Sequence, residues 1–185
     1  LCDVYPIGAL TIDQKGTHLA ELSAMHQSEA RVRIFSDDGH CVSDPVLMRR
    51  ALEYVKAFNG VIAQHAQEPR LTKNAQMNES ELSGRLGLTG WPAVAEEAIV
   101  ARDVLLTEHV QSKLHVCHAS TAGTVEILRW AKGKKVNVTA EVTPHHLFLS
   151  QIHCESYDAK FKVNPPLRTD DDINELRKAL AEGII

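Results

Sequence analysis

The sequence lacks the features that mark several large classes of protein. No apolar run approaches the roughly 18 residues that a membrane-spanning helix needs, and no signal peptide opens the chain. No block of basic residues occurs, and the net charge is −4, so neither nucleic acid nor a membrane is expected as a partner. The four cysteines form no Cys-x-x-Cys pair, and this usage favours a reducing compartment over secretion. These absences predict a cytoplasmic protein.

Nucleotide-binding signatures are also missing from the sequence. Neither a Gly-x-Gly-x-x-Gly motif nor a phosphate-loop motif stands at any expected turn from strand to helix, which argues against a nucleotide-binding fold. We find no internal repeat and no low-complexity segment. What remains is a chain of 185 residues with 44% apolar and 24% charged residues, ordinary values for a globular protein. We expect one domain over residues 1–185 with a real core.

Strand-like apolar runs alternate with segments whose apolar residues recur at helical spacing. The expected strands cover residues 1–10, 32–36, 61–65, 113–118 and 136–142, and residues 183–185 resemble the start of a sixth. The expected helices cover residues 19–26, 45–58, 92–108, 122–132 and 170–182, while residues 66–90 read as an irregular loop with at most a short helix near 80–86. Strict alternation predicts a parallel sheet with helices outside it. A doubly wound sheet and a (β/α)₈ barrel both remain open.

Polar residues stand at the ends of four expected strands. They are Asp37 or Asp38, His65, His118, and the segment 143–146. Because the carboxyl ends of parallel strands lie at one edge of the sheet, these side chains are predicted to converge. Two imidazoles and a carboxylate suit Zn²⁺, which polarises a carbonyl and lowers the pKa of bound water to about 7. That chemistry serves the hydrolysis of amides.

The alternation of side chains along a strand helps to choose between neighbouring candidate ligands. His115 and His118 are three residues apart and point to opposite faces of a strand, so only one reaches the site. His118 is nearer the strand end, and we expect His115 to pack outward against the helices. Asp37 and Asp38 cannot both point inward, and a turn role before the glycine that follows them is as plausible as a metal role.

Two further segments allow more than one interpretation. His145 and His146 follow a proline and either brace the loop or bind a metal. Asn164 precedes two prolines and either forms a turn or hydrogen-bonds an amide edge of a substrate.

Five segments, in the right order and with the right gaps, resemble dihydroorotase of the amidohydrolase superfamily, closest to the class I bacterial type. The segments are residues 35–39, 63–65, 115–121, 141–146 and 163–168. The resemblance implies a TIM-type (β/α)₈ barrel, of which this chain would be an incomplete central part covering about strands three to seven. It also implies the reversible cyclisation of N-carbamoyl-L-aspartate to L-dihydroorotate, a step in pyrimidine synthesis.

The resemblance assigns roles to four residues. The second aspartate of the first segment would bridge two Zn²⁺ ions, and it matches Asp38. The histidines at the ends of the next two strands would bind zinc, and they match His65 and His118. Asn164 would contact the pyrimidine ring. The resemblance thus chooses Asp38 over Asp37, a choice that the residues alone left open.

The family's His-x-His pair and a substrate-binding arginine are expected upstream of Leu1, and its catalytic aspartate beyond Ile185. We therefore expect no catalytic residue in this chain, and no turnover by the 185 residues alone. The expected strand 32–36 does not end in a lysine that could be carbamylated, as dihydropyrimidinases and allantoinases would require. We expect the chain to be an excerpt of a longer protein, because a five-strand barrel fragment exposes two sheet edges.

Two alternatives follow from the same resemblance. The first is another cyclic-amide hydrolase, related to dihydropyrimidinase or allantoinase, against which the missing lysine argues. The second is a non-catalytic homologue that acts as a scaffold for aspartate transcarbamoylase, against which the three retained ligands argue. The expected partners are the small-molecule substrates, dihydroorotate and N-carbamoyl-L-aspartate. A homodimer and an association with aspartate transcarbamoylase stay open.

Overall fold

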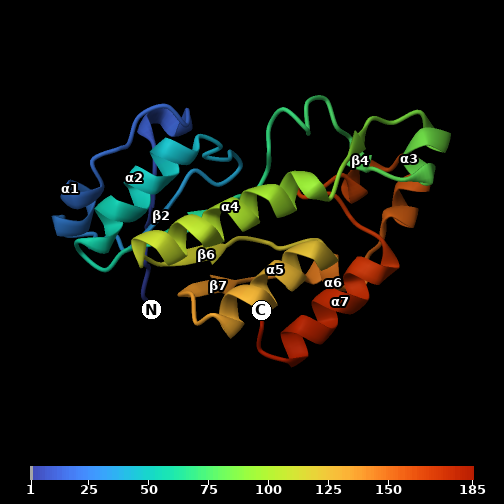
Figure 1. Cartoon of the computed structure of the whole chain (residues 1–185). Helices are drawn as coiled ribbons and strands as arrows, with labels where there is room; N and C mark the ends of the chain where they lie inside the picture. The colour runs from blue at the N-terminus through green and yellow to red at the C-terminus, as the bar shows by residue number, and fades with distance from the viewer. Residues whose placement is uncertain (1) are drawn as a thin grey trace.

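The computed structural model describes residues 2–185 and has one main sheet (Figure 1). Its five strands are β1 (Ile7–Ala9), β2 (Ile34–Ser36), β3 (Val61–Gln64), β6 (Leu114–Val116) and β7 (Val138–Ala140). The helices are α1 (Leu22–Gln27), α2 (Pro45–Lys56), α3 (Glu81–Leu86), α4 (Val94–Val110), α5 (Ala122–Gly133), α6 (Pro144–Phe148) and α7 (Asp170–Ala181). Leu1, which the sequence places in the first expected strand, lies outside the described residues.

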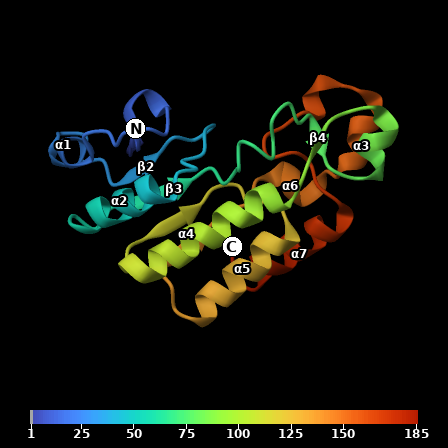
Figure 2. The ribbon, with the colours of Figure 1, turned by 45° about the horizontal axis from the view of Figure 1, so that its top comes forward.

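The order of the strands decides between the two folds that the sequence left open. The five strands are all parallel and lie in the order β1-β2-β3-β6-β7, so spatial neighbours follow one another along the chain. Right-handed crossovers that always advance in one direction place every connecting helix on the same face of the sheet. Helices α2, α4, α5 and α7 accordingly pack in a row, each against the next (Figures 1 and 2). A doubly wound sheet reverses direction and covers both faces, so this fold is the central part of a TIM-type barrel.

The two faces of the sheet differ in polarity and burial. On the helix side, the core includes Phe35, Ile62 and Leu114, each at most 1% exposed. On the other face, Ile7 and Ile34 are 60% and 38% exposed. This second face is the one that lies inside a closed barrel.

His115 lies on this inner face, so the prediction that it packs outward against the helices is wrong. Its neighbours Leu114 and Val116 are buried in the core beneath α4 and α5, and side chains alternate along a strand. The prediction assigned His115 to the face opposite His118 by strand alternation. It failed because the strand ends at Val116 and His118 has a φ of +33°. The period of two holds only while the backbone stays extended.

Helix starts follow the capping residues in the sequence. Asp44 accepts a hydrogen bond from the backbone N–H of Leu47 at 2.7 Å, and Pro45 occupies the first helical position of α2. Thr121 accepts one from the N–H of Thr124 at 3.0 Å and so caps α5. The expected starts of these two helices are confirmed.

Two connections contain more regular structure than the sequence predicted. Residues 66–90 contain a short strand, β4 (Met77–Asn78), which pairs in parallel with β5 (Gly90–Trp91). The expected short helix there is confirmed as α3. Between β7 and α7, α6 is followed by the 3₁₀ helices η2 (Gln151–Ser156) and η3 (Ala159–Phe161), and a third 3₁₀ helix, η1 (Ile12–Gln14), follows β1.

Residues 183–185 form no strand, which corrects the expected start of a sixth. Gly183 has a φ of +71°, a left-handed conformation that commonly ends a helix. The N–H groups of Ile184 and Ile185 then donate to the carbonyl of Ala179 at 2.9 and 3.3 Å. These amides cap α7 and are not available to a strand ladder.

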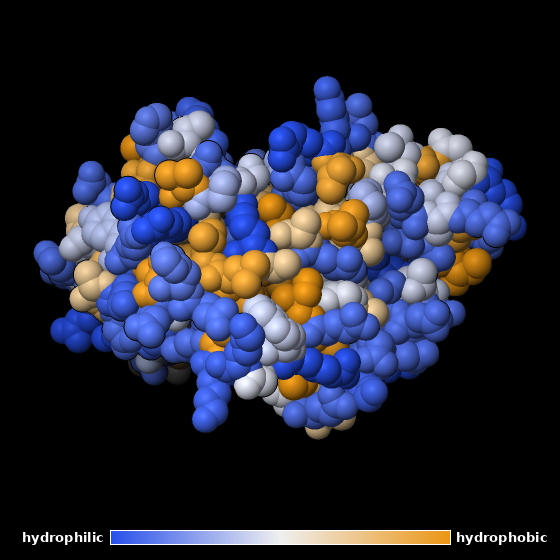
Figure 3. All heavy atoms as spheres, viewed as in Figure 1, coloured by the Kyte–Doolittle hydropathy of each residue, from blue (hydrophilic) through white to orange (hydrophobic). Residues whose placement is uncertain are grey.

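The outer surface of α4 and α5 carries an apolar patch, seen in orange near the middle of Figure 3. Leu105 on α4 and Trp130 on α5 are 53% and 42% exposed, and with Ala101 and Ile127 they line a groove. Within residues 2–185, no helix combines the length and the apolar character needed to cross a membrane.

Candidate metal centre

Three strand ends bring one carboxylate and two imidazoles together. Asp38 follows β2, His65 follows β3 and His118 follows β6. Asp38 Oδ1 lies 3.2 Å from His118 Nε2 and 3.3 Å from His65 Nδ1, and the two ring nitrogens are 3.0 Å apart. One ligand atom from each residue lies within 4.8 Å of the others. The structure thus brings together the three residues that the sequence predicted to converge.

The two adjacent aspartates point in different directions. Asp37 is 3% exposed and accepts hydrogen bonds from the backbone N–H groups of Leu10 and Thr11, both at 2.9 Å, and from the Thr11 hydroxyl. Its carboxylate therefore fixes the turn after β1. Asp38 points to the histidines, and its side chain is 61% exposed. The geometry separates a structural aspartate from one whose oxygens are open to a ligand.

The protonation of the cluster suits a divalent cation. Burial lowers the pKa of His65, and the nearby charge of His118 acts in the same direction. Partial burial by itself would raise the pKa of Asp38, but the hydrogen bond from His118 and the charges of both histidines hold it below its ordinary value. At neutral pH His65 is therefore a neutral imidazole beside an ionised carboxylate. Such groups are the nitrogen and oxygen donors that Zn²⁺ binds.

His146 braces the loop, one of the two roles that the sequence left open. It is 1% exposed, and its two ring nitrogens contact Thr143 Oγ1 at 2.8 Å and the carbonyl of Pro165 at 3.1 Å. Burial, with the charge of His145 second, lowers the pKa of His146 to about 4. Both nitrogens are occupied, so none is left for a metal. Within residues 2–185, His145 belongs to no group of three potential metal ligands.

Asn164 lies beside the centre, although it is about a hundred residues from His65 in sequence. Its side-chain amide donates a hydrogen bond to Gln67 Oε1 at 3.3 Å, and the same oxygen lies 2.9 Å from His65 Nε2. Sequence reasoning did not single out Gln67. Its position two residues after a strand-end histidine is the signal that was available.

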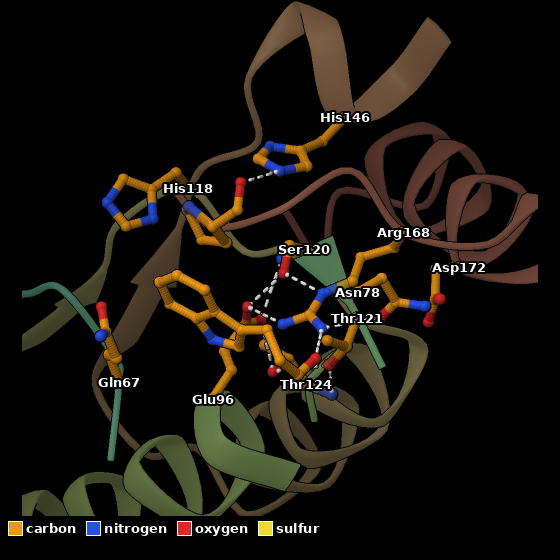
Figure 4. A network of polar contacts seen from close by, with 12 residues as sticks. Gln67, Asn78, Glu96, His118, Ser120, Thr121, Thr124, His146, Arg168 and Asp172 are labelled. Carbon is orange, nitrogen blue, oxygen red and sulfur yellow. Dashed lines mark hydrogen bonds and ion pairs between the residues drawn. The ribbon is translucent and has the colours of Figure 1, made fainter. Parts of the chain in front are cut away.

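A buried network around Arg168 includes Ser120, which follows His118 by two residues (Figure 4). Arg168 is 1% exposed and donates to Ser120 Oγ at 3.1 Å and to Asn78 Oδ1 at 2.9 Å. Glu96, 3% exposed, accepts from the N–H of Ser120 at 2.9 Å and from Thr124 Oγ1 at 2.8 Å. Burial lowers the pKa of Arg168, and nearby carboxylates, Glu96 foremost, oppose this shift. The network joins β4, α4 and α5 to the segment before α7.

A second group of potential ligands lies on the inner face of the sheet. His115 Nε2 is 3.4 Å from Glu141 Oε2, its Nδ1 is 2.8 Å from Thr139 Oγ1, and Cys117 completes the group. Burial raises the pKa of Cys117 to about 12, with the charges of Glu141 and Asp38 in the same direction. Its sulfur is therefore a thiol at neutral pH, whereas zinc binds the thiolate. This group suits a metal less well than the first.

A cleft of about 440 Å³ opens next to the centre, between the loops that follow β1, β2 and β3. It is lined by residues 13–16, 39–41, 43, 67 and 69. Gln67 belongs both to its wall and to the contacts of His65. A small molecule therefore has room at the strand ends.

Comparison with known proteins relates the chain to dihydroorotases. Residues 1–124 match the family described as "Dihydro-orotase-like". The chain is 68% identical over 182 residues to a dihydroorotase of Leifsonia xyli and 66% identical over 184 residues to one of Streptomyces coelicolor. These matches cover 98% and 100% of this chain and 42% and 43% of the relatives, so the chain spans less than half of their length.

Solved structures show the same fold. A dihydropyrimidinase of Brevibacillus agri superimposes with a TM-score of 0.74 at 25% identity, covering 89% of this chain and 38% of that protein. A D-hydantoinase of Bacillus sp. AR9 superimposes with a TM-score of 0.77 at 24% identity, covering 97% of this chain and 40% of that protein. Both likenesses support the assignment of the five strands to a barrel.

Proposed function

The chain belongs to the dihydro-orotase-like family, and we propose that it forms the central part of a zinc-dependent dihydroorotase. The reaction is the reversible hydrolysis of the cyclic amide of L-dihydroorotate to N-carbamoyl-L-aspartate, in pyrimidine synthesis in the cytoplasm. The relatives named dihydroorotase at 66% and 68% identity support this proposal. The observation that carries it is the convergence of Asp38, His65 and His118 at one edge of the sheet.

In this proposal the three converging residues hold the metal. His65 Nδ1 and His118 Nε2 are the nitrogen donors, and Asp38 is the oxygen donor. Asp38 contacts both histidines through Oδ1, and its carboxylate would take part in holding the metal in a site proposed for two Zn²⁺. A bound divalent ion supplies Lewis acidity to the amide carbonyl.

The remaining roles fall to polar groups around the metal. Asn164 uses its side-chain N–H on Gln67, so its carbonyl oxygen stays available to accept from a ring N–H of the substrate. Proton transfer to the leaving nitrogen needs an acid that we do not assign to residues 1–185. We therefore propose that these residues form one domain that holds metal and orients substrate, and that catalysis requires the rest of the barrel.

The test uses the chain joined to the remaining segments of the 66% identical Streptomyces coelicolor relative. With Zn²⁺, this protein is expected to hydrolyse dihydroorotate and to cyclise N-carbamoyl-L-aspartate. The 185-residue chain alone is expected to do neither. A joined, folded, zinc-loaded protein without either activity would contradict the proposal, as would normal turnover by the isolated chain.

The likeness to hydantoinases makes a second cyclic-amide hydrolase the competing function. Ser36 ends β2 where a carbamylated lysine would be required, and within the described residues Asp38 is the only carboxylate in contact with His65 and His118. Hydantoin, dihydrouracil and allantoin should therefore be poor substrates beside dihydroorotate. A joined protein that prefers any of the three would favour the competing function.

Association with other proteins is an open part of the proposal. A homodimer and a complex with aspartate transcarbamoylase are both compatible with the apolar patch on α4 and α5. The convergence of three metal-binding side chains counts against a purely scaffolding homologue, which would not need them.

A further inference from the structure

Gln67 connects the metal centre to the residue that we expect to contact substrate. Its Oε1 lies 2.9 Å from His65 Nε2 and accepts a hydrogen bond from Asn164 Nδ2 at 3.3 Å. We propose that Gln67 is a positioning residue, which fixes the tautomer of His65 and ties the orientation of Asn164 to it. This inference rests on the proposed function and adds a residue to it.

The orientation of the Gln67 amide follows from its second partner. Thr72 is 6% exposed, and its hydroxyl donates to the backbone carbonyl of Glu68 at 3.1 Å. Its single proton is therefore used, and it can only accept from Gln67, whose Nε2 lies 2.7 Å from Thr72 Oγ1. The nitrogen of the amide must face Thr72, and its oxygen must face His65.

A carbonyl oxygen has no proton to donate, so the ring nitrogen opposite it must carry one. His65 in its neutral form therefore has its proton on Nε2 and a bare lone pair on Nδ1. Nδ1 is the atom that faces Asp38 Oδ1 at 3.3 Å and His118 Nε2 at 3.0 Å. The chain of contacts from Thr72 through Gln67 thus presents the ligand atom to the metal. A partner of this kind also raises the basicity of a metal-binding imidazole.

The same oxygen receives the amide of Asn164, so one side chain serves two functional residues. If Gln67 turned its nitrogen toward them, Asn164 Nδ2 would face a donor, and His65 would keep its contact only by moving its proton from Nε2 to Nδ1. Gln67 also lines the cleft at the strand ends. Its loss should therefore affect zinc affinity and substrate binding at once, which a residue with a purely structural role would not do.

The experiment uses the joined protein described above with four substitutions. Gln67→Leu removes the acceptor, Gln67→Glu keeps an acceptor opposite His65, and Thr72→Val removes the group that orients the amide. Gln27→Leu, at an exposed position on α1, is the matched control. Zinc affinity is measured by chelator competition, the His65 tautomer by ¹⁵N NMR of the metal-free protein, and KM and kcat with dihydroorotate.

Gln67→Leu should weaken zinc binding by about 10- to 100-fold, raise KM, and abolish the single Nε2–H tautomer of His65. Gln67→Glu should retain that tautomer and restore most of the zinc affinity. Thr72→Val should populate both tautomers, and Gln27→Leu should match the unsubstituted protein. If Gln67→Leu does not fold, the His65 tautomer measured by ¹⁵N NMR in Thr72→Val tests the inference in its place.

Unchanged zinc affinity and an unchanged His65 tautomer in Gln67→Leu, or in Thr72→Val where the first does not fold, would overturn the inference. The proposed function fails separately, because it requires dihydroorotase activity of the unsubstituted joined protein. The metal and NMR readouts do not depend on that activity.

Discussion

Two polar clusters lie close together in this molecule, and they are built in opposite ways. Around Arg168, each carboxylate and hydroxyl has a protein partner, and the charged groups are almost fully buried. Around Asp38, two imidazole nitrogens face one carboxylate oxygen within 3.3 Å, and the carboxylate is open to solvent. The first cluster pairs its charges inside the protein, with Arg168 Nη2 lying 4.0 Å from Glu96 and without a hydrogen-bond partner in the described part of the chain. The second brings its nitrogen and oxygen atoms toward a common point.

This difference separates structure from function among residues of similar type. Buried ions that pair with one another hold segments together, and breaking one side leaves an uncompensated charge. Imidazole nitrogens and a carboxylate oxygen that converge on one point are the arrangement that a divalent cation binds. The comparison therefore predicts that substitutions around Arg168 lower the stability of the fold, and that substitutions around Asp38 weaken metal binding.

Substitution in the Arg168 cluster should have the largest effect, and it should act on stability. Arg168→Met leaves Glu96 buried without its counter-charge and should lower the free energy of unfolding by about 3–5 kcal/mol. Urea denaturation of the joined protein measures this change. Arg129→Met, which removes a more exposed cation from α5, is the control and should cost about 1 kcal/mol or less. A loss below about 1 kcal/mol for Arg168→Met would contradict the role of the network.

Substitution in the metal centre should act on zinc. His118→Ala removes one of the two imidazole ligands proposed in this chain and should weaken zinc binding by more than about 100-fold. This loss exceeds the one expected when a residue that only hydrogen-bonds a metal ligand is removed. The unfolding free energy of the metal-free protein should change by about 1 kcal/mol or less. Chelator competition and urea denaturation separate the two effects. His109→Ala, on the exposed side of α4, should alter neither, and equal zinc affinity in the two variants would count against the site.

The pH dependence of stability should identify His146 as structural. Its pKa is about 4 in the folded protein and about 6.5 when unfolded, so the unfolded chain binds the proton first. Its contribution is complete above pH 6.5 and is lost as the pH falls to about 4, by about 2–3 kcal/mol. Buried Asp103, whose pKa is raised to about 6, acts in the opposite direction, since stability then rises as the pH falls.

The comparison of His146→Gln with the unsubstituted protein isolates the histidine, because both proteins contain Asp103. Between pH 7 and pH 4, the free energy of unfolding should fall more in the unsubstituted protein than in His146→Gln. Urea midpoints at several pH values give this difference. Parallel curves for the two proteins would show that His146 does not titrate as its burial requires.

The second ligand group should show the smallest effect. Cys117 is a thiol at neutral pH because burial raises its pKa to about 12. Cys117→Ser should therefore leave zinc affinity within about threefold of the unsubstituted value at pH 7. A larger loss would show that the inner-face group shares in metal binding, and the contrast with His118→Ala would then weaken.

Local features of the fold were predictable because they depend on neighbouring residues. Asp44 and Thr121 cap helices with their own side chains, and alternation of strands and helices implied a parallel sheet. The convergence of strand ends also followed, since parallel strands share one edge. This is why His65, His118 and one of Asp37 and Asp38 could be grouped from the residues alone, whereas the family resemblance chose Asp38.

Other features depend on partners far along the chain. Arg168 contacts Asn78, 90 residues away, and nothing near either residue signals the contact. The face of His115 was mispredicted because the backbone leaves the extended conformation before His118. The choice between a barrel and a doubly wound sheet required the order of the strands in space, which alternation alone does not contain.

The most direct test of the metal centre is a zinc titration of the joined protein and of its His65→Ala/His118→Ala variant, followed by calorimetry. Asp38, His65 and His118 are proposed as ligands in a site for two ions, so the unsubstituted protein should bind two Zn²⁺ per chain. The double variant should lose at least one of them while remaining folded. Two ions bound with unchanged affinity in the folded double variant would contradict the account.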